Sequence, residues 1–222
     1  MSLTIFDAKA DYLKRYPHQI KEALKEFTHF GMDGCLGFPQ EHEILDRKEF
    51  QLTPLLRMLH GKVVRQLGSS GGGGNHFVEF GEIELIENNI LNLPSGNYMA
   101  LLSHSGSRGG MGAAIARHYS DIAREVCKLP REAQHFAWLG LDTDAGQEYW
   151  MSMNLAGDFA QACHERIHIN LSKALGLKVI ANVNNHHNFA WREEIAPPGR
   201  YAIVHRKGAT PAGKGIAGVY SG

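Results

Sequence analysis

A glycine-rich loop at residues 68–79, GSSGGGGNHFVE, leads directly into four chemically active side chains. Five of the seven residues before Asn75 are glycine, so this backbone can adopt positive φ angles and approach a ligand closely. Successive amides in such a loop can form a concave site for an anion such as phosphate. The loop then supplies an amide, a metal-binding imidazole, an aromatic ring and a carboxylate, from Asn75, His76, Phe77 and Glu79. This combination predicts a binding site, because flexible linkers combine glycine with small hydroxyl residues instead.

Histidine recurs where other apolar segments end. His104, His187 and His205 each follow a run that we expect to form a strand, and His76 adjoins another. Since binding residues tend to lie on loops held by rigid elements, we expect the four histidines to share one site. The chain has 13 histidines and only 3 cysteines, so imidazoles would supply most ligands of any bound metal ion. Neutral imidazole binds Mn, Zn, Fe, Cu and Ni, and the pattern therefore does not select the metal.

Two cations accompany these histidines. Arg108 lies in the segment SGSRG just before a predicted helix, where free backbone amides favour anions. Lys207 lies in the segment HRKGAT. Arginine can bind phosphate oxygens through two parallel hydrogen bonds, whereas lysine acts as a point charge. We therefore expect a phosphate-bearing ligand, the alternative being that both cations are simply solvated.

A competing motif lies in a predicted long helix. His164, Glu165 and His168 fit the pattern H-E-x-x-H of zinc peptidases, with both imidazoles on one helix face. However, the helix face opposite Cys163 and Ile167 is predicted to be exposed to solvent, and no helix with a third ligand follows. Both features argue against a zinc peptidase, which stays an alternative.

Hydrophobic periodicity predicts an α+β fold with mixed β-sheets flanked by helices. We expect one domain over residues 1–222, with residues 1–60 not assigned with certainty. Helices are expected at residues 17–30, 53–61, 111–126 and 144–175. Strands are expected at residues 62–67, 76–86, 98–102, 178–183 and 201–204, the third and the last of them buried.

The composition is that of a globular protein, with 43% hydrophobic and 21% charged residues. Lys+Arg 23 balances Asp+Glu 23, which gives no net field for non-specific nucleic-acid binding. No apolar run has the length of a membrane span, so we expect no membrane association. The three cysteines, Cys35, Cys127 and Cys163, are far apart, which predicts a reducing, cytoplasmic environment.

Four motifs together resemble the RtcB family of RNA-splicing ligases. They are GGGNHFVE at residues 72–79, HSGSRG at 104–109, HN at 187–188 and HRKGAT at 205–210. They occur in the order found in that family, and the resemblance covers about residues 60–220. The first two motifs are long and specific.

The resemblance implies an enzyme of tRNA splicing or RNA repair. RtcB ligases join an RNA 3′-phosphate or 2′,3′-cyclic phosphate to a 5′-hydroxyl, with GTP and Mn²⁺ as cofactors and with an activating protein partner. By resemblance, the metal ligands would be His76, His104 and His187. The guanine nucleotide would be contacted by Asn75, Phe77, Glu79 and Asn188. Arg108 and Lys207 would hold RNA phosphates.

Two family motifs are not found in this sequence. One is the Asp-x-x-Cys metal motif; Asp33 and Cys35 have the right residue types but the wrong spacing. The other is the His-Gly-Ala-Gly-Arg motif with the guanylylated histidine. We therefore expect a piece of a longer ligase, or a short member without the nucleophile, and no complete ligation cycle from this chain. A non-catalytic nucleotide or RNA binder is a further alternative.

Overall fold

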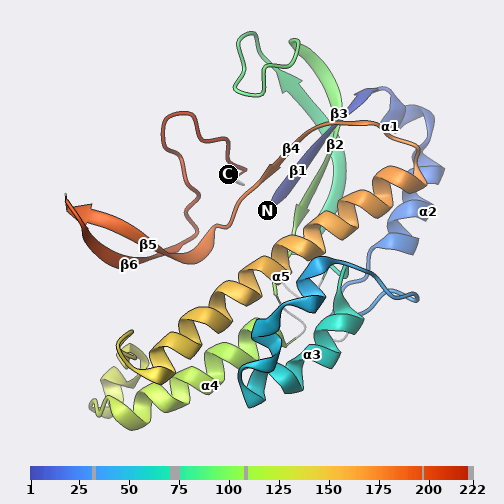
Figure 1. Ribbon diagram of the computed structural model, residues 1–222. Coiled ribbons are helices and arrows are strands. Elements are labelled where there is room, and N and C mark those ends of the chain that lie inside the picture. The colour runs from blue at the N-terminus through green and yellow to red at the C-terminus, as the bar shows by residue number, and fades with distance from the viewer. Residues whose placement is uncertain (32–33, 71–75, 108–109, 197, 220–222) are drawn as a thin grey trace. The chain divides into compact units, whose positions relative to one another are not determined.

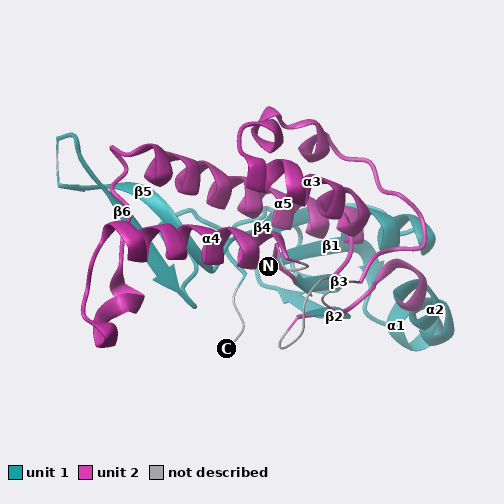
Figure 2. Cartoon of the chain, turned by 90° about the horizontal axis from the view of Figure 1, so that it is seen from below, with its two compact units in different colours: residues 1–24, 77–104, 168–222 teal, residues 25–76, 105–167 magenta. Residues whose placement is uncertain are grey.

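The computed structural model describes residues 1–31, 34–70, 76–107, 110–196 and 198–219 (Figure 1). The chain divides into two compact units (Figure 2). The first unit comprises Met1–Leu24, Phe77–His104 and His168–Gly222, and the second comprises Lys25–His76 and Ser105–Ile167. The expectation of a single domain over residues 1–222 stays a prediction.

The first unit contains a four-stranded antiparallel sheet with the strand order β2-β3-β1-β4. Its strands are β1 (Ser2–Lys9), β2 (Phe77–Leu85), β3 (Gly96–His104) and β4 (Val179–Asn184). Side chains alternate between the two faces of such a sheet. One face carries Phe77 and Leu102, which pack with Met1, Val183 and Val219. The opposite face carries Thr4 and Ser103, both fully buried although polar.

A second, two-stranded sheet in the same unit consists of β5 (Asn188–Ala196) and β6 (Arg200–Lys207). The unit also contains α1 (Tyr12–Arg15), most of α2 (Pro17–Phe27) and the end of α5 (Asp144–Ala174). Strand β6 was expected to be buried. That prediction is wrong, because Tyr201 is 53% and Ile203 38% exposed. The side chains of residues 201–204 point alternately to the two faces of the β5–β6 ribbon, and only one of these faces is partly covered.

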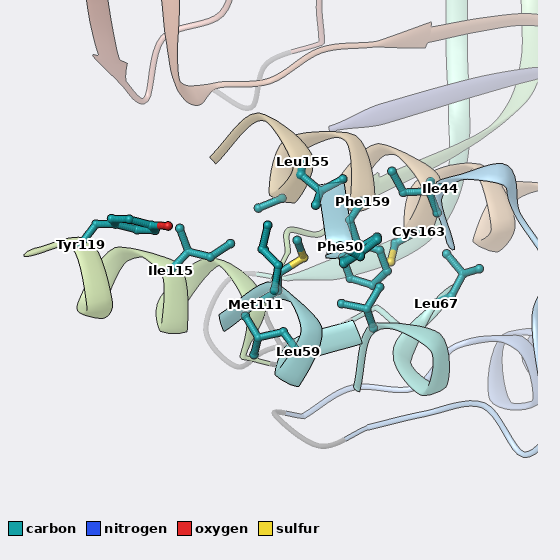
Figure 3. Close-up of a cluster of buried hydrophobic side chains, with 14 residues drawn as sticks. Ile44, Phe50, Leu59, Leu67, Met111, Ile115, Tyr119, Leu155, Phe159 and Cys163 are labelled. Atoms are coloured by element: carbon teal, nitrogen blue, oxygen red, sulfur yellow. The ribbon is translucent and has the colours of Figure 1, made fainter. Parts of the chain in front are cut away.

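Helices α3 and α4 and most of α5 form the second unit together with short 3₁₀ turns. The bounds are α3 (Pro54–Gln66), α4 (Met111–Val126), η1 (Glu43–Asp46), η2 (Lys48–Gln51) and η3 (Arg131–Phe136), with α5 given above. Their apolar faces meet in one core, drawn in Figure 3. Phe50, Leu56 and Phe159 are at most 1% exposed in it. Periodic apolar positions on three helices therefore bury one shared core.

Helix α3 shows why one predicted strand is wrong. Residues 62–67 were expected to form a strand, yet α3 continues through them and past Gly61. Thr53 caps the helix by accepting a hydrogen bond from the Leu56 amide at 3.1 Å. Leu56, Leu59 and Val63 then recur at helical spacing, and all three are buried. The burial of these three apolar side chains in the helical core outweighs the preference of Val63 and Val64 for β-strands.

The other expected elements are present, with small shifts at their ends. Helix α4 has the expected bounds and begins after Gly110, whose φ of 119° suits glycine alone. Strands β2, β3 and β4 match the predicted ones at 76–86, 98–102 and 178–183, and α2 and α5 match the helices at 17–30 and 144–175. The α+β class is therefore confirmed. Among the described helices, none has the length and apolar character needed to cross a membrane.

The core predicts a clear contrast between two phenylalanines. Phe159→Ala should lower the free energy of unfolding by about 3–5 kcal/mol, because Phe159 is 1% exposed and its loss leaves a cavity. Phe136→Ala is the matched control, since Phe136 is 77% exposed and should change stability by less than about 0.5 kcal/mol. Urea denaturation monitored by circular dichroism measures both. Equal effects of the two substitutions would contradict the described core.

Candidate functional site

The sheet of the first unit places two of the predicted site residues side by side. Phe77 begins β2 and lies opposite His104, the last residue of β3, in the antiparallel register. Residues directly opposite in such a pair share a face, and the two rings contact edge to face at 5.7 Å between centroids. Glu79 lies two residues further along β2, on the same face, and is exposed. His104 itself is only 7% exposed.

His187 meets His104 from a distant part of the sequence. The two imidazole rings are 4.7 Å apart between centroids, in an edge-to-face arrangement. Two neutral imidazoles this close can direct nitrogens to one ion. Within the part of the chain that the structure describes, no group of three or more His, Cys, Asp or Glu residues is placed to hold a metal ion. Of the three histidines expected as metal ligands, the structure brings His104 and His187 together, and their metal role stays a prediction.

His76 belongs to the second unit, whereas His104 and His187 belong to the first. Within the second unit, His76 lies against Gly106, since a Cβ on this glycine would be 3.8 Å from ring atoms Cε1 and Nε2. The first and second motifs therefore approach each other at this point. Asn75 and Arg108 lie outside the described residues. The metal role of His76 and the roles of Asn75 and Arg108 stay predictions.

Asn188 and Lys207 face each other across the start of the β5–β6 ribbon. Both side chains are exposed. The Asn188 Oδ1 atom accepts a hydrogen bond from the Gly208 amide at 2.6 Å, which fixes the plane of the Asn188 side chain. Because Asn188 follows His187 directly, the ribbon begins beside the imidazole pair. His205 was expected to share the histidine site, but it lies within β6 and is exposed.

Asn185 holds the backbone around His187, a role that the sequence analysis did not identify. Its Nδ2 donates to the carbonyl of Val219 at 3.0 Å, and its Oδ1 accepts from the Val219 amide at 2.6 Å. The His187 carbonyl in turn accepts from the Ala209 amide at 3.0 Å. These bonds attach the segment after β6 to the turn that presents His187. The only sequence signal was the position of Asn185 inside an Asn-Asn-His-His-Asn run.

The H-E-x-x-H face of α5 is buried, which corrects the expectation of an exposed face. His164 and His168 are each 4% exposed. His164 Nε2 donates to the Ser105 carbonyl at 3.3 Å. The sequence pattern suggested an exposed face because histidine and glutamate are polar, but polar partners on other segments allow these histidines to be buried.

Both ring nitrogens of His168 are engaged. Nδ1 lies 2.7 Å from Thr4 Oγ1 and Nε2 lies 2.7 Å from Ser103 Oγ. Thr4 Oγ1 also accepts a hydrogen bond from Asn182 Nδ2 at 2.7 Å, so this hydroxyl lies between His168 and Asn182. Burial lowers the pKa of His168 to about 3, which keeps the ring neutral. His168 therefore ties α5 to β1 and β3, and a zinc-peptidase role is not favoured.

Glu165, the third member of that motif, also has structural partners. His42 Nδ1 accepts from the Ile44 amide at 3.1 Å, so its Nε2 carries the proton that is donated to Glu165 at 3.0 Å. Gln161 Nε2 donates to the same carboxylate at 2.9 Å. The motif thus connects α5 to the 3₁₀ turns of the second unit.

The fold and the site together define an α+β protein with paired imidazoles at the end of a sheet. The profile of the family described as tRNA-splicing ligase RtcB matches residues 7–222. The chain therefore belongs to the RtcB family.

Curated relatives agree with this assignment. The chain is 29% identical over 218 residues to a tRNA-splicing ligase RtcB of Pyrococcus abyssi, a match that covers 87% of this chain and 23% of the relative. It is 29% identical to that of Pyrococcus horikoshii, covering 90% and 25%, and 27% identical to that of Aeropyrum pernix, covering 87% and 44%. The chain thus spans less than half the length of these relatives.

The buried His168 predicts a pH dependence of stability. Its pKa is about 3 in the folded chain and 6.5 in its ordinary state, so between these values the unfolded chain binds more protons. The free energy of unfolding should therefore fall as the pH falls below 6.5, with His168 contributing up to about 1.4 kcal/mol per pH unit.

His168→Gln should remove this contribution, and urea denaturation between pH 7 and 5 measures it. His135→Gln is the control, because His135 is exposed in η3. A pH slope that is the same in the His168 variant and in the unaltered chain would contradict the described environment.

Proposed function

We propose that this chain provides the metal-binding and nucleotide-binding part of an RNA ligase of the RtcB kind. The contact between His104 and His187 is the observation that carries the proposal. Membership of the RtcB family supports it, as do the printed names of the relatives.

The donor chemistry fits a divalent ion such as Mn²⁺. His104 and His187 are close enough to share an ion, and two imidazole ligands would leave coordination positions for water or phosphate oxygens. His76 would be the third ligand. When bound, Mn²⁺ neutralises charge that develops on phosphate oxygens. The protein holds its imidazoles through Phe77 on one side and through the Asn185 contacts on the other.

The guanine nucleotide is assigned to the sheet face beside this pair. Phe77 offers an aromatic ring, Glu79 an exposed carboxylate and Asn188 a fixed side-chain amide. A carboxylate suits the N–H donors of guanine, and an amide can both donate and accept. Asn75 would complete the set. GTP is the nucleotide that the RtcB resemblance implies.

RNA is the proposed substrate, with a 3′-phosphate or 2′,3′-cyclic phosphate on one end and a 5′-hydroxyl on the other. Lys207, at the end of β6 and next to Asn188, would hold a phosphate as a point charge, and Arg108 would bind one through two parallel hydrogen bonds. Transfer of a phosphoryl-type group depends mainly on positioning and charge neutralisation, which these residues could supply. We assign the guanylylated histidine of the family to no residue of this chain.

Mn²⁺ affinity tests the proposal. His104→Ala/His187→Ala should weaken Mn²⁺ binding more than about 100-fold, since losing even an outer partner of a metal ligand costs 10–100-fold. Electron paramagnetic resonance of free Mn²⁺ during titration measures the affinity. His18→Ala/His135→Ala removes two exposed histidines and is the matched control, which should bind as the unaltered chain does.

Unchanged affinity in the His104/His187 variant would contradict the proposal. If a His164→Ala/His168→Ala variant lost Mn²⁺ binding while the His104→Ala/His187→Ala variant kept it, the metal site would have to be placed on α5. Mn²⁺ and GMP binding without any RNA joining, even with the other segments of a ligase added, would favour a non-catalytic relative.

A further inference from the structure

The β5–β6 ribbon, labelled in Figure 1, has two faces whose side chains differ in exposure. The residues of one face are all partly covered: Phe189, Trp191, Glu193, Ala202, Val204 and Arg206. The opposite face is exposed at seven positions: Asn188, Arg192, Glu194, Tyr201, Ile203, His205 and Lys207. We call these seven residues the outer face. Alternation along both strands produces this division, although Ala190, which lies on the outer side opposite His205, is buried.

The covered face already has its interactions within the ribbon and the turn before it. Phe189 stacks on His186 at 4.6 Å between centroids and meets Trp191 edge to face at 5.5 Å. Arg206 lies over the Trp191 ring at 5.6 Å and forms an ion pair with Glu193. These contacts stabilise the ribbon conformation that presents the outer face.

The outer face joins positive charge to an exposed aromatic ring. Arg192 lies over Tyr201, with 4.9 Å between its guanidinium carbon and the ring centroid, and Tyr201 is 53% exposed. The acidic member of the face, Glu194, accepts a hydrogen bond from the Gly199 amide at 2.5 Å and is directed to the turn. Arg192 and Lys207 outnumber this single carboxylate, so the outer face carries a net positive charge, and His205 lies between Ile203 and Lys207 along β6.

We infer that the outer face binds a single-stranded stretch of RNA that leads away from the phosphate position at Lys207. Lys207 and Arg192 would contact phosphates, and a base would stack against Tyr201. Rows of cations with interspersed aromatic rings bind single strands in this way, because every base has a stacking surface. From Lys207 to Tyr201 the strand rises about 20 Å, enough for several nucleotides. The inference rests on the proposed function, since it extends its RNA site.

A neutral, apolar partner is a poorer fit to this surface. Ile203 is the aliphatic member of the outer face and lies directly opposite Arg192 in the register. A protein partner would have to pair Arg192 and Lys207 with acidic groups, whereas a nucleic-acid strand supplies a phosphate at each step.

The test compares RNA affinity of the full chain with that of Arg192→Ala/Tyr201→Ala. The probe is a fluorescein-labelled single-stranded RNA of mixed sequence with a 3′-phosphate, followed by fluorescence anisotropy in the presence of Mn²⁺. The double variant should bind at least about tenfold more weakly, because stacking and one phosphate contact are lost. The dependence of log affinity on log salt should become shallower by about 0.7.

Three control variants separate binding from folding. Arg131→Ala/Phe136→Ala removes an exposed arginine and an exposed aromatic ring in η3 and should leave RNA affinity unchanged. Tyr201→Phe keeps the stacking surface and should retain affinity. Arg192→Lys keeps the charge and should retain the salt dependence.

The possible failures are distinguishable. Equal RNA affinity of the double variant and the unaltered chain would overturn the outer-face inference alone. Mn²⁺ binding by the unaltered chain without RNA binding would overturn it as well. Loss of Mn²⁺ binding in the double variant would also overturn it, because a distortion of the ribbon would then explain the result. Failure of the unaltered chain to bind either Mn²⁺ or RNA would overturn the proposed function.

Discussion

The neutral imidazole of His168, held between Thr4 and Ser103, is the constraint on which the first unit depends. Its two 2.7 Å contacts attach α5 to β1 and β3 on a face where these hydroxyl groups are buried. Without the imidazole, each of these buried hydroxyls would lose one hydrogen bond, which costs about 0.5–1.5 kcal/mol. Ser103 precedes His104, so the same contact fixes the strand end that presents the candidate metal ligand.

The two faces of the four-stranded sheet carry different kinds of residue, structural anchors on one and candidate site residues on the other. The face towards His168 carries the buried polar anchors, and the other face carries Phe77, Glu79 and His104. Antiparallel pairing brings Phe77 to His104, and the turn before β5 brings His187 to the same imidazole. Site geometry thus follows from strand register and from the Asn185 contacts. The separate β5–β6 ribbon begins at Asn188, directly after His187.

Several features could be predicted from residue types and spacing, and others could not. Helix α4 and the strand that begins at Phe77 follow from periodicity and from the glycines before them. The contact of His104 with His187 was expected because histidines end several strands. Burial of His164 and His168 could not be foreseen, since it depends on hydroxyl and carbonyl partners far away in the sequence. The prediction of a strand at residues 62–67 was wrong because a short apolar run fits a strand and a helix equally well.

The most direct test of the central claim is an anomalous-difference map from crystals of this chain soaked in Mn²⁺. The account predicts a manganese peak within coordination distance of both His104 and His187. A peak beside His164 and Glu165, or occupied manganese sites that touch neither His104 nor His187, would contradict it.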